Sequence, residues 1–223
     1  MKGKISEIFE SMQGEGIYAG EKQIFVRFFG CNLSCGFCDT KPYHFVEYAP
    51  RELLRHIKRY RGAHHSIAFT GGEPLMQKDF LKAAMRLTHE SGFINYLETN
   101  GTLPQALEDV LDYSDIVAMD LKLPSSTREV SFWDEHRRFL NLAAGKETFL
   151  KMVICESTDE EDVRRGISLI KESHPAAVLV LQPNSYEQSD SLMEKVEYFR
   201  NICASENITV CLIPQIHKII GVK

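Results

Sequence analysis

Short apolar segments rich in β-branched and aromatic residues alternate along this chain with longer segments whose apolar residues recur at helical spacing. Strands are expected at residues 5–10, 24–29, 66–69, 94–97, 116–119, 148–154, 177–181 and 208–213, and helices at 51–61, 78–90, from about 104, 132–144, 160–173 and 191–206. Such alternation predicts a parallel sheet covered by helices. Because a complete eight-fold barrel would be crowded in 223 residues, we expect an α/β fold of a partial, open (β/α) TIM-like barrel.

The composition restricts the class of protein further. The chain is 43% hydrophobic, enough for a sizeable core, and contains no repeat or linker, so a single domain over residues 1–223 is expected. Its net charge of −5 disfavours direct nucleic-acid binding. No apolar run is long enough to span a bilayer, and no apolar signal region follows Met1–Glu7. These features predict a cytoplasmic protein that does not bind membranes.

Polar or glycine-containing motifs follow five of the expected strands, after Phe29, Phe69, Leu97, Met119 and Leu181. Barrels and open α/β sheets place their functional sites at the carboxyl ends of their strands. We therefore expect these motifs to meet in one site.

The first of these motifs contains Cys31, Cys35 and Cys38, spaced C-x3-C-x2-C. Three thiolates are one ligand short of a closed zinc site, but they fit a four-iron cluster that leaves one iron open to another ligand. Three structural cysteines, or zinc with His44 as a fourth ligand, are the alternatives. The other cysteines, Cys155, Cys203 and Cys211, lie among apolar neighbours and are predicted to be buried.

Individual residues in the other motifs suggest further roles. Gly71 and Gly72 allow the backbone to approach a bound amino-acid group, and Glu73 can accept a hydrogen bond from its ammonium. Arg27, inside a strand, either faces solvent or points at an anion. The hydroxyl of Thr40 is either a magnesium ligand or a turn cap. Lys122 and Gln182, at strand ends, either hold a ribose or carboxylate or are solvated.

The cysteine spacing, with Phe37 before the last cysteine, and the segment Thr70–Pro74 together resemble the radical S-adenosylmethionine enzymes. With Gln13–Gly16, Cys31–Thr40, Glu98–Gly101 and Pro214–Lys218 added, the chain resembles the 7-carboxy-7-deazaguanine synthase family. The resemblance runs from about residue 5 to residue 223 and is least distinctive at residues 125–145.

This resemblance implies a lyase that converts 6-carboxy-5,6,7,8-tetrahydropterin to 7-carboxy-7-deazaguanine by radical ring contraction with loss of ammonia. The product feeds queuosine and related deazapurine nucleosides, which places the enzyme in a tRNA modification pathway. The resemblance also implies a 4Fe-4S cluster, S-adenosyl-L-methionine and Mg2+ as cofactors. As partners it implies a one-electron donor of the flavodoxin or ferredoxin type and a second copy of the chain in a homodimer.

Site residues are carried over from the family by position. The cluster ligands fall on Cys31, Cys35 and Cys38, and the magnesium ligand falls on Thr40. Together with Glu73, the S-adenosylmethionine contacts are Phe37, Cys38, Asp39, Gly72, Asp120, Leu121, Lys122, Gln182, Pro183 and Asn184. The substrate contacts are Met12, Gln13, Gly14, Glu15, Arg27, Thr70, His217 and the α-carboxylate of Lys223. Some relatives carry Ser-Pro-Lys where this chain has Asp120-Leu121-Lys122, so the contacts at Asp120 and Leu121 depart from the family pattern.

Two other functions share part of this pattern. A glycyl-radical-type activating enzyme, acting on a protein partner, would use the cysteine loop and Gly71–Glu73 but would give no role to Gln13–Gly16 or to the tail around His217. A non-catalytic iron–sulfur or zinc protein would not need Gly71–Glu73. The sequence therefore favours a small-molecule substrate.

Overall fold

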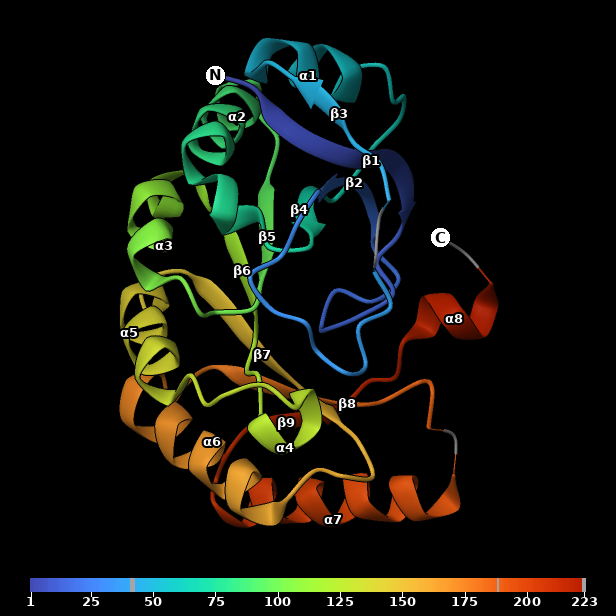
Figure 1. Ribbon diagram of the computed structural model, residues 1–223, viewed down its shortest axis with the longest axis vertical. Helices are drawn as coiled ribbons and strands as arrows, with labels where there is room; N and C mark the ends of the chain where they lie inside the picture. Colours follow the sequence, from blue (N-terminus) through green and yellow to red (C-terminus); the bar gives the residue numbers. More distant parts are fainter. Residues whose placement is uncertain (41–42, 188, 222–223) are drawn as a thin grey trace.

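The computed structural model describes residues 1–40, 43–187 and 189–221, apart from the side chains at positions 217 and 220. A single sheet organises the chain, in the order β3-β1-β2-β4-β5-β6-β7-β8-β9 (Figure 1). The strands are β1 (Gly3–Met12), β2 (Lys22–Phe28), β3 (Val46–Tyr48), β4 (Ser66–Gly71), β5 (Asn95–Thr99), β6 (Ile116–Asp120), β7 (Glu147–Ile154), β8 (Val178–Pro183) and β9 (Val210–Leu212).

Strand direction divides the sheet into two parts. From β2 to β9 each neighbouring pair is parallel, whereas β1 pairs antiparallel with both β2 and β3. No pairing joins β9 to β3 within the described residues, so the sheet curves without closing. This confirms the expected α/β fold with an open, partial barrel.

The first strand differs from its prediction. It was expected to end at Glu10, before a break at Ser11–Gly16, but β1 continues to Met12. Ser11 and Met12 pair with Gln23 and Lys22 of β2, so ladder hydrogen bonds extend the strand to the start of the hairpin loop. The loop itself is closed by hydrogen bonds from Gln13 N to Glu21 O and from Gly20 N to Gln13 O.

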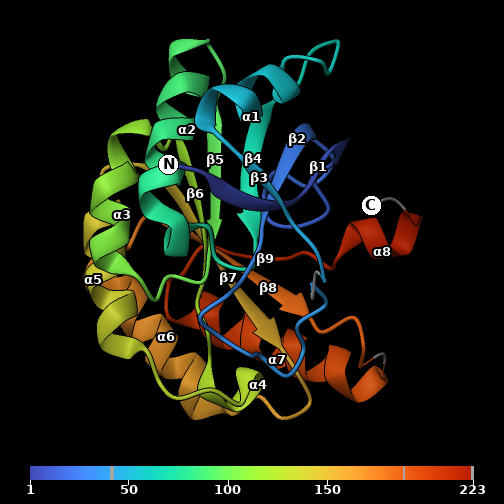
Figure 2. The ribbon, with the colours of Figure 1, turned by 45° about the horizontal axis from the view of Figure 1, so that its top comes forward.

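The longer helices cover the convex side of the sheet, whereas α8 lies with the loops on the other side (Figures 1 and 2). The helices are α1 (Pro50–Ile57), η1 (Pro74–Gln77), α2 (Lys78–Glu90), α3 (Pro104–Val110), η2 (Leu111–Tyr113), α4 (Pro124–Thr127), α5 (Trp133–Ala143), α6 (Glu160–Ser173), α7 (Asp190–Ser205) and α8 (Ile216–Ile220). The short elements β3, η1, η2, α4 and α8 were not predicted from the sequence.

The concave face of the barrel has two layers. The lower layer is an apolar floor, made of Phe25, Ala68, Tyr96, Ile116, Phe149 and Val180. Alternate residues of a strand share one face, so the residues two positions further along these strands form the layer above. These are Arg27, Thr70, Glu98, Ala118, Lys151 and Gln182. The upper layer is mostly polar and lies toward the carboxyl ends of the strands.

The opposite face of the sheet packs on the helices in one large core. Leu97, Leu150 and Leu179 are fully buried there, together with Leu140 of α5 and Ile167 of α6. As predicted, Cys155 and Cys203 are buried, whereas Cys211 is half-buried; all six cysteines are free thiols. Among the described residues, the structure contains no helix with the length and apolarity of a membrane span.

The segment after β9 crosses the open side of the barrel. It leaves the β9 edge and ends in α8, next to the β1–β2 hairpin (Figure 2). Ile216 N donates to Gly14 O at 2.8 Å, which fastens the tail to the hairpin loop. The chain therefore bridges the gap that strand pairing leaves open.

Candidate functional site

One cavity lies at the carboxyl ends of the parallel strands, above the apolar floor. It gathers most of the predicted site residues: Met12, Gln13, Gly14, Glu15, Arg27, Cys31, Cys35, Phe37, Cys38, Asp39, Thr40, Thr70, Gly72, Asp120, Lys122, Gln182 and Asn184. The predicted residues Glu73, Leu121 and Pro183 do not line it. The side chain of His217 and all of Lys223 lie outside the described residues, so their predicted contacts stay predictions.

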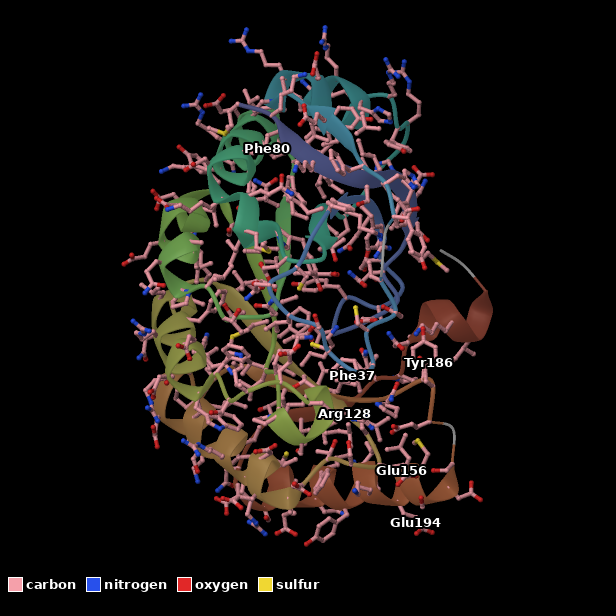
Figure 3. The ribbon with its side chains drawn as sticks, viewed as in Figure 1. Phe37, Phe80, Arg128, Glu156, Tyr186 and Glu194 are labelled. Atoms are coloured by element: carbon pink, nitrogen blue, oxygen red, sulfur yellow. The ribbon has the colours of Figure 1, made fainter. Side chains whose placement is uncertain are left out.

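The cysteine loop follows β2 and opens onto this cavity. Cys31 is exposed, Cys38 is half-buried and Cys35 is buried. The loop is held from below, because Gly36 N donates to Thr127 O of α4 at 2.9 Å. Figure 3 shows Phe37 and Arg128 near this junction between the loop and α4.

The donor set of the loop fits a cluster better than a single ion. Cys35 is buried and burial raises the pKa of its thiol, so this cysteine sits in the water-poor surroundings that a cluster needs, whereas Cys31 is exposed toward the cavity. In the described part of the chain, no three His, Cys, Asp or Glu side chains converge closely enough to bind one metal ion. The ligands of a four-iron cluster bind different irons, so they need not converge on a single point.

The two glycines after β4 are required by the neighbouring backbone. A Cβ atom on Gly72 would lie 1.9 Å from the carbonyl oxygen of Gly30, and one on Gly71 would lie 2.4 Å from backbone atoms of Phe28. Gly72 N donates to Phe28 O, and Glu73 N donates to Gly30 O. That the glycines admit a bound amino-acid group stays a prediction; the structure shows that they clamp this turn to the segment that leads into Cys31.

Glu73 differs from its prediction. Its side chain is fully buried, and its carboxylate accepts hydrogen bonds from Leu75 N, Asn100 N and the hydroxyl of Thr99. Burial raises its pKa to about 7. The carboxylate therefore faces the protein interior rather than a ligand ammonium, and its role is to join the turn after β4 to the turn after β5.

Asn100, in the turn after β5, is a site residue that the sequence reasoning missed. Its Nδ2 donates to Asn32 Oδ1 at 2.9 Å and lies 3.9 Å from Cys31 Sγ, and its carbonyl oxygen lies 3.2 Å from Nε2 of the buried His136. The segment Glu98–Gly101 was recognised as a motif, but its contact with the cysteine loop depends on the fold. A hydrogen bond to a cysteine ligand is one way to tune a cluster.

Arg27 points from β2 into the cavity and is partly paired. Its Nε lies 2.9 Å from Glu7 Oε2, and its Nη1 donates to Thr40 Oγ1 at 3.0 Å. Thr40 in turn donates to Asp39 Oδ1 at 3.1 Å. The side chain of Arg27 is 21% exposed, so one side of the guanidinium remains open to an anion. The structure thus brings Arg27 and Thr40 together, as expected of a shared site.

The hairpin loop supplies Gln13 and Glu15. Gln13 is buried, and its amide nitrogen donates to Gln23 and to Glu98, so its side chain mainly holds the loop in place. Thr70 donates to the other oxygen of Glu98. Glu98 therefore lies at the centre of this end of the cavity, although it was not among the predicted site residues.

The opposite end of the cavity is formed by β6 and β8. Asp120 Oδ2 accepts from Lys122 Nζ at 2.8 Å, and the Lys122 ammonium lies 5.5 Å from the centre of the Phe37 ring. Gln182 is 2% exposed, and its Oε1 has no partner in the described structure. An unpaired buried acceptor is costly, so Gln182 Oε1 is suited to a ligand donor.

Two predicted contacts are not supported by this geometry. The side chain of Leu121 is 1% exposed and belongs to the core on the other face of β6, because neighbouring residues of a strand point to opposite faces. Pro183 likewise follows Gln182 on β8 and points away from the cavity lining. Asp120 and Gln182 lie at the strand positions whose side chains point to the concave face, and both line the cavity.

Lys151 of β7 is a cationic group of the cavity that sequence reasoning missed. Its ammonium contacts Glu15 and lies 3.2 Å from Asp120 Oδ1. The available signal was a charged residue between Phe149 and Val153, in the part of the strand that is otherwise apolar from Phe149 to Ile154. Burial lowers the pKa of Lys151, but Asp120 and Glu15 outweigh burial and raise it, so Lys151 is a cation at neutral pH.

The carboxyl groups Glu15 and Glu98 have opposite pKa shifts. Burial opposes ionisation of both. At Glu15 the charge of Lys151 and the hydrogen bond from Gln215 outweigh burial and lower the pKa. At Glu98 burial prevails, helped by the charge of Glu15, and raises the pKa. The cavity therefore contains one carboxylate that stays ionised beside one that protonates more readily.

The tail contacts both ends of the site. Gln215 Nε2 donates to Glu15 Oε1 at 2.6 Å, and Lys218 Nζ lies 2.8 Å from Asp39 Oδ2. Lys218 also donates to Ser185 and lies 4.3 Å from the centre of the Tyr186 ring, which Figure 3 shows beside α8. The tail is thus fastened to the hairpin loop, to the end of the cysteine loop and to the loop after β8.

The sequence matches the Radical SAM superfamily over residues 25–196. The 7-carboxy-7-deazaguanine synthase of Geobacter sulfurreducens is 32% identical over 98% of this chain and 97% of the relative. That of Thermococcus kodakarensis is 32% identical over the full length of both.

Among solved structures, QueE from Escherichia coli matches with a TM-score of 0.67, covering 95% of this chain and 94% of that chain at 21% identity. A domain of a pyruvate-formate lyase-activating enzyme from Bacteroides vulgatus covers 66% of this chain with a TM-score of 0.53 at 16% identity. At these identities the structural likeness shows the fold alone. The sequence matches show more: the chain belongs to the radical SAM superfamily and, within it, to the 7-carboxy-7-deazaguanine synthase family.

Proposed function

We propose that this protein converts 6-carboxy-5,6,7,8-tetrahydropterin to 7-carboxy-7-deazaguanine, using S-adenosylmethionine and a 4Fe-4S cluster. One observation carries the proposal: the cysteine loop opens onto the same cavity as the Gln13–Glu15 hairpin loop, Arg27 and the tail. Family membership over the full length of the chain supports the same reaction.

Residues on one side of the cavity suit the cofactors. Cys31, Cys35 and Cys38 would ligate three irons of the cluster, and when bound the cluster and S-adenosylmethionine would supply the radical that begins ring contraction. Asp120 and Gln182 present oxygen acceptors toward the same space. Acceptors of this kind suit the ribose hydroxyls or the amino group of S-adenosylmethionine. Phe37 and the apolar floor would limit the access of water to reactive species.

Arg27 and Thr40 suit the carboxylate of the pterin. A guanidinium pairs with a carboxylate through two hydrogen bonds, and the open side of Arg27 is available for this contact. Thr40 and Asp39 are hard oxygen donors of the type that Mg2+ prefers. We propose that magnesium and the substrate carboxylate share this corner, where the metal would replace the hydrogen bond that Arg27 now donates to Thr40.

The opposite side of the cavity suits the pterin ring. A pterin edge carries both donors and acceptors. Glu15 is held ionised and can accept from a ring donor, and Glu98 lies at the same end of the cavity, where it accepts from Gln13 and Thr70. This pairing supports the assignment of Glu15 as a substrate contact and adds Glu98 to it.

Further features of the proposed function come from the family resemblance. We propose that the protein works as a homodimer, receives electrons from a flavodoxin or ferredoxin, and acts in the cytoplasm. The six free thiols agree with a reducing compartment. Sedimentation of the cluster-loaded protein tests the dimer.

The direct test is anaerobic reconstitution of the cluster, followed by incubation with S-adenosylmethionine, Mg2+, a reductant and the tetrahydropterin. We expect 7-carboxy-7-deazaguanine in the mass spectrum and one ammonia released per product. S-adenosylmethionine cleavage that is indifferent to the pterin, without this product, would reject the proposal. That result would favour the alternative of a glycyl-radical-type activating enzyme, which no feature of the described cavity specifically supports.

A further inference from the structure

A row of contacting side chains, four of them charged and alternating in sign, crosses the cavity from the tail to the cysteine loop. In order, it consists of Gln215, Glu15, Lys151, Asp120, Lys122 and Phe37. Its first members come from the tail and the hairpin loop, which form the pterin end of the proposed site. Its last members come from β6 and the cysteine loop, which form the cofactor end.

Among these six residues, Lys151 is the one that contacts both the pterin end and the cofactor end of the cavity. Its Nζ contacts Glu15 Oε2 and lies 3.2 Å from Asp120 Oδ1, and Asp120 is also its register partner on β6. All three side chains are largely buried, with exposed fractions of 16% for Lys151, 21% for Glu15 and 23% for Asp120. Solvent therefore screens their interaction only weakly.

We propose that Lys151 is a positioning residue that couples pterin binding to S-adenosylmethionine binding. This rests on the proposed function. The two carboxylates share one ammonium, and each belongs to a different end of the site. A ligand that donates a hydrogen bond to Asp120 draws that carboxylate toward itself, which leaves the ammonium to Glu15 and fixes Glu15 for the second ligand. We therefore expect each ligand to lower the Kd of the other.

The two carboxylates that contact Lys151 have other partners, so the fold should survive the loss of Lys151. Asp120 keeps its ion pair with Lys122, and Glu15 keeps its hydrogen bond from Gln215. What disappears is the charge between two buried carboxylates, which then repel each other. The raised pKa of Lys151 also argues against a role as the acid that protonates the departing ammonia, because a cation held this strongly releases its proton poorly.

The test is a binding cycle on the cluster-loaded protein without a reductant, so that no bond is broken. The Kd of the tetrahydropterin is measured by anaerobic calorimetry with and without saturating S-adenosylmethionine, and the reciprocal pair is measured as well. In the unaltered protein we expect each ligand to tighten the other roughly tenfold, within the usual range of such coupling. In Lys151→Met, which keeps the length of the side chain but removes the charge, the coupling should fall to within about twofold.

Two further variants make the test specific. Lys151→Arg keeps a cation and should restore most of the coupling. Lys171→Met removes a surface lysine that is paired with Glu206 at 2.9 Å, and its coupling should equal that of the unaltered protein. Iron content and the cluster absorbance of each variant report whether the fold is intact.

Equal coupling in Lys151→Met and the unaltered protein, or an unaltered protein without coupling, would overturn the positioning role while leaving the proposed function standing. A cluster-loaded protein that binds S-adenosylmethionine but not the pterin would instead overturn the proposed function, and the coupling with it. A merely structural lysine would weaken both ligands without changing how each one affects the other.

Discussion

At the scale of single residues, Thr40 occupies the position where substrate and metal binding would meet. Its oxygen accepts a hydrogen bond from Arg27 and donates one to Asp39. A metal ion at this oxygen would compete with the guanidinium, because both are cations that seek the same lone pairs. Binding of a substrate carboxylate to Arg27 would relieve this competition.

Thr40→Ala should therefore raise the Mg2+ concentration that gives half-maximal turnover, while the iron content stays unchanged. Thr40→Ser keeps the hydroxyl and should behave like the unaltered protein. Turnover measured across a magnesium titration distinguishes the variants. If Thr40→Ala and the unaltered protein show the same magnesium requirement, Thr40 is a turn residue and not a metal ligand.

Glu73 leads to a prediction about pH. Burial raises its pKa from 4.5 to about 7, so between these values the folded protein binds a proton that the unfolded chain has released. The free energy of unfolding must then fall as pH rises through this window, by about 3 kcal/mol for a shift of this size. Below this pH window the Glu73 carboxyl is protonated in both the folded and the unfolded protein. Above the window it is ionised in both, and the full loss of unfolding free energy is present.

The glutamine of Glu73→Gln cannot ionise, so this variant should lack the loss of stability that ionisation of Glu73 causes. Urea unfolding of the cluster-loaded proteins between pH 5.5 and 8 should show a steeper loss of stability in the unaltered protein than in Glu73→Gln. Glu90→Gln, an exposed position on α2, serves as the control and should follow the unaltered protein. Parallel curves for all three proteins would show that Glu73 does not titrate in this range.

At the scale of elements, the turn after β4 and the segment that enters the cysteine loop form one unit. They approach so closely that no side chain fits between Gly72 and Gly30. Because Cys31 follows Gly30 directly, the position of the first proposed cluster ligand depends on a turn that lies 40 residues later in the chain. The contact explains why a glycine pair stands at residues 71–72.

Gly72→Ala should separate this turn from β2 and displace the cysteine loop. Overpacking against backbone typically costs about 1–3 kcal/mol, and we expect a lower Tm together with reduced iron after reconstitution. Gly145→Ala is the matched control, since a Cβ atom there would meet no atom within 4 Å. Full iron loading and an unchanged Tm in Gly72→Ala would contradict this close approach.

The sequence was informative about long, periodic elements and about strand ends. Segments such as Lys78–Glu90 and Glu160–Ser173 carry enough turns to show helical spacing, and both helices occur within these bounds. Three- to five-residue elements such as β3, α4 and α8 are too short to show a period. The direction of β1 was not predictable either, because alternation of residues in a strand is the same in parallel and antiparallel sheets.

Within the site, residue types and strand ends were predictable, but partners were not. Three closely spaced cysteines and a charge inside a strand are unusual in themselves, which pointed to Cys31 and Arg27, whereas Gln182 followed from the family resemblance. Lys151 and Asn100 were missed because their roles depend on which strands are neighbours. The burial of Glu73 likewise follows from the meeting of two turns that are separated by more than 20 residues.

At the scale of the whole molecule, the tail completes a barrel that the sheet leaves open. It joins the β9 edge to the hairpin loop through Ile216 and Gln215, and Lys218 adds an ion pair with Asp39, which directly follows Cys38. Closure of the site thus depends on contacts made by the last part of the chain.

Lys218→Met should loosen this closure without removing any residue proposed to bind a ligand. We expect a several-fold higher KM for the tetrahydropterin and more 5′-deoxyadenosine formed per product, because water and reductant reach the site more easily. Steady-state kinetics with both products quantified give these values, and Lys171→Met is again the surface control. An unchanged KM and an unchanged product ratio would show that the ion pair with Asp39 does not hold the tail in the working enzyme.

The most direct test of the whole mechanism compares the unaltered protein with Cys35→Ala in an anaerobic assay that contains limiting S-adenosylmethionine. Cys35 is the buried cysteine of the loop, and alanine would remove one of the three proposed iron ligands while the pterin end of the cavity stays intact. The assay measures 7-carboxy-7-deazaguanine and 5′-deoxyadenosine together. We predict that the unaltered protein forms the deazaguanine from the tetrahydropterin and that Cys35→Ala forms neither compound. Formation of the deazaguanine by Cys35→Ala, or its absence with a fully loaded and reducible cluster in the unaltered protein, would contradict the proposed mechanism.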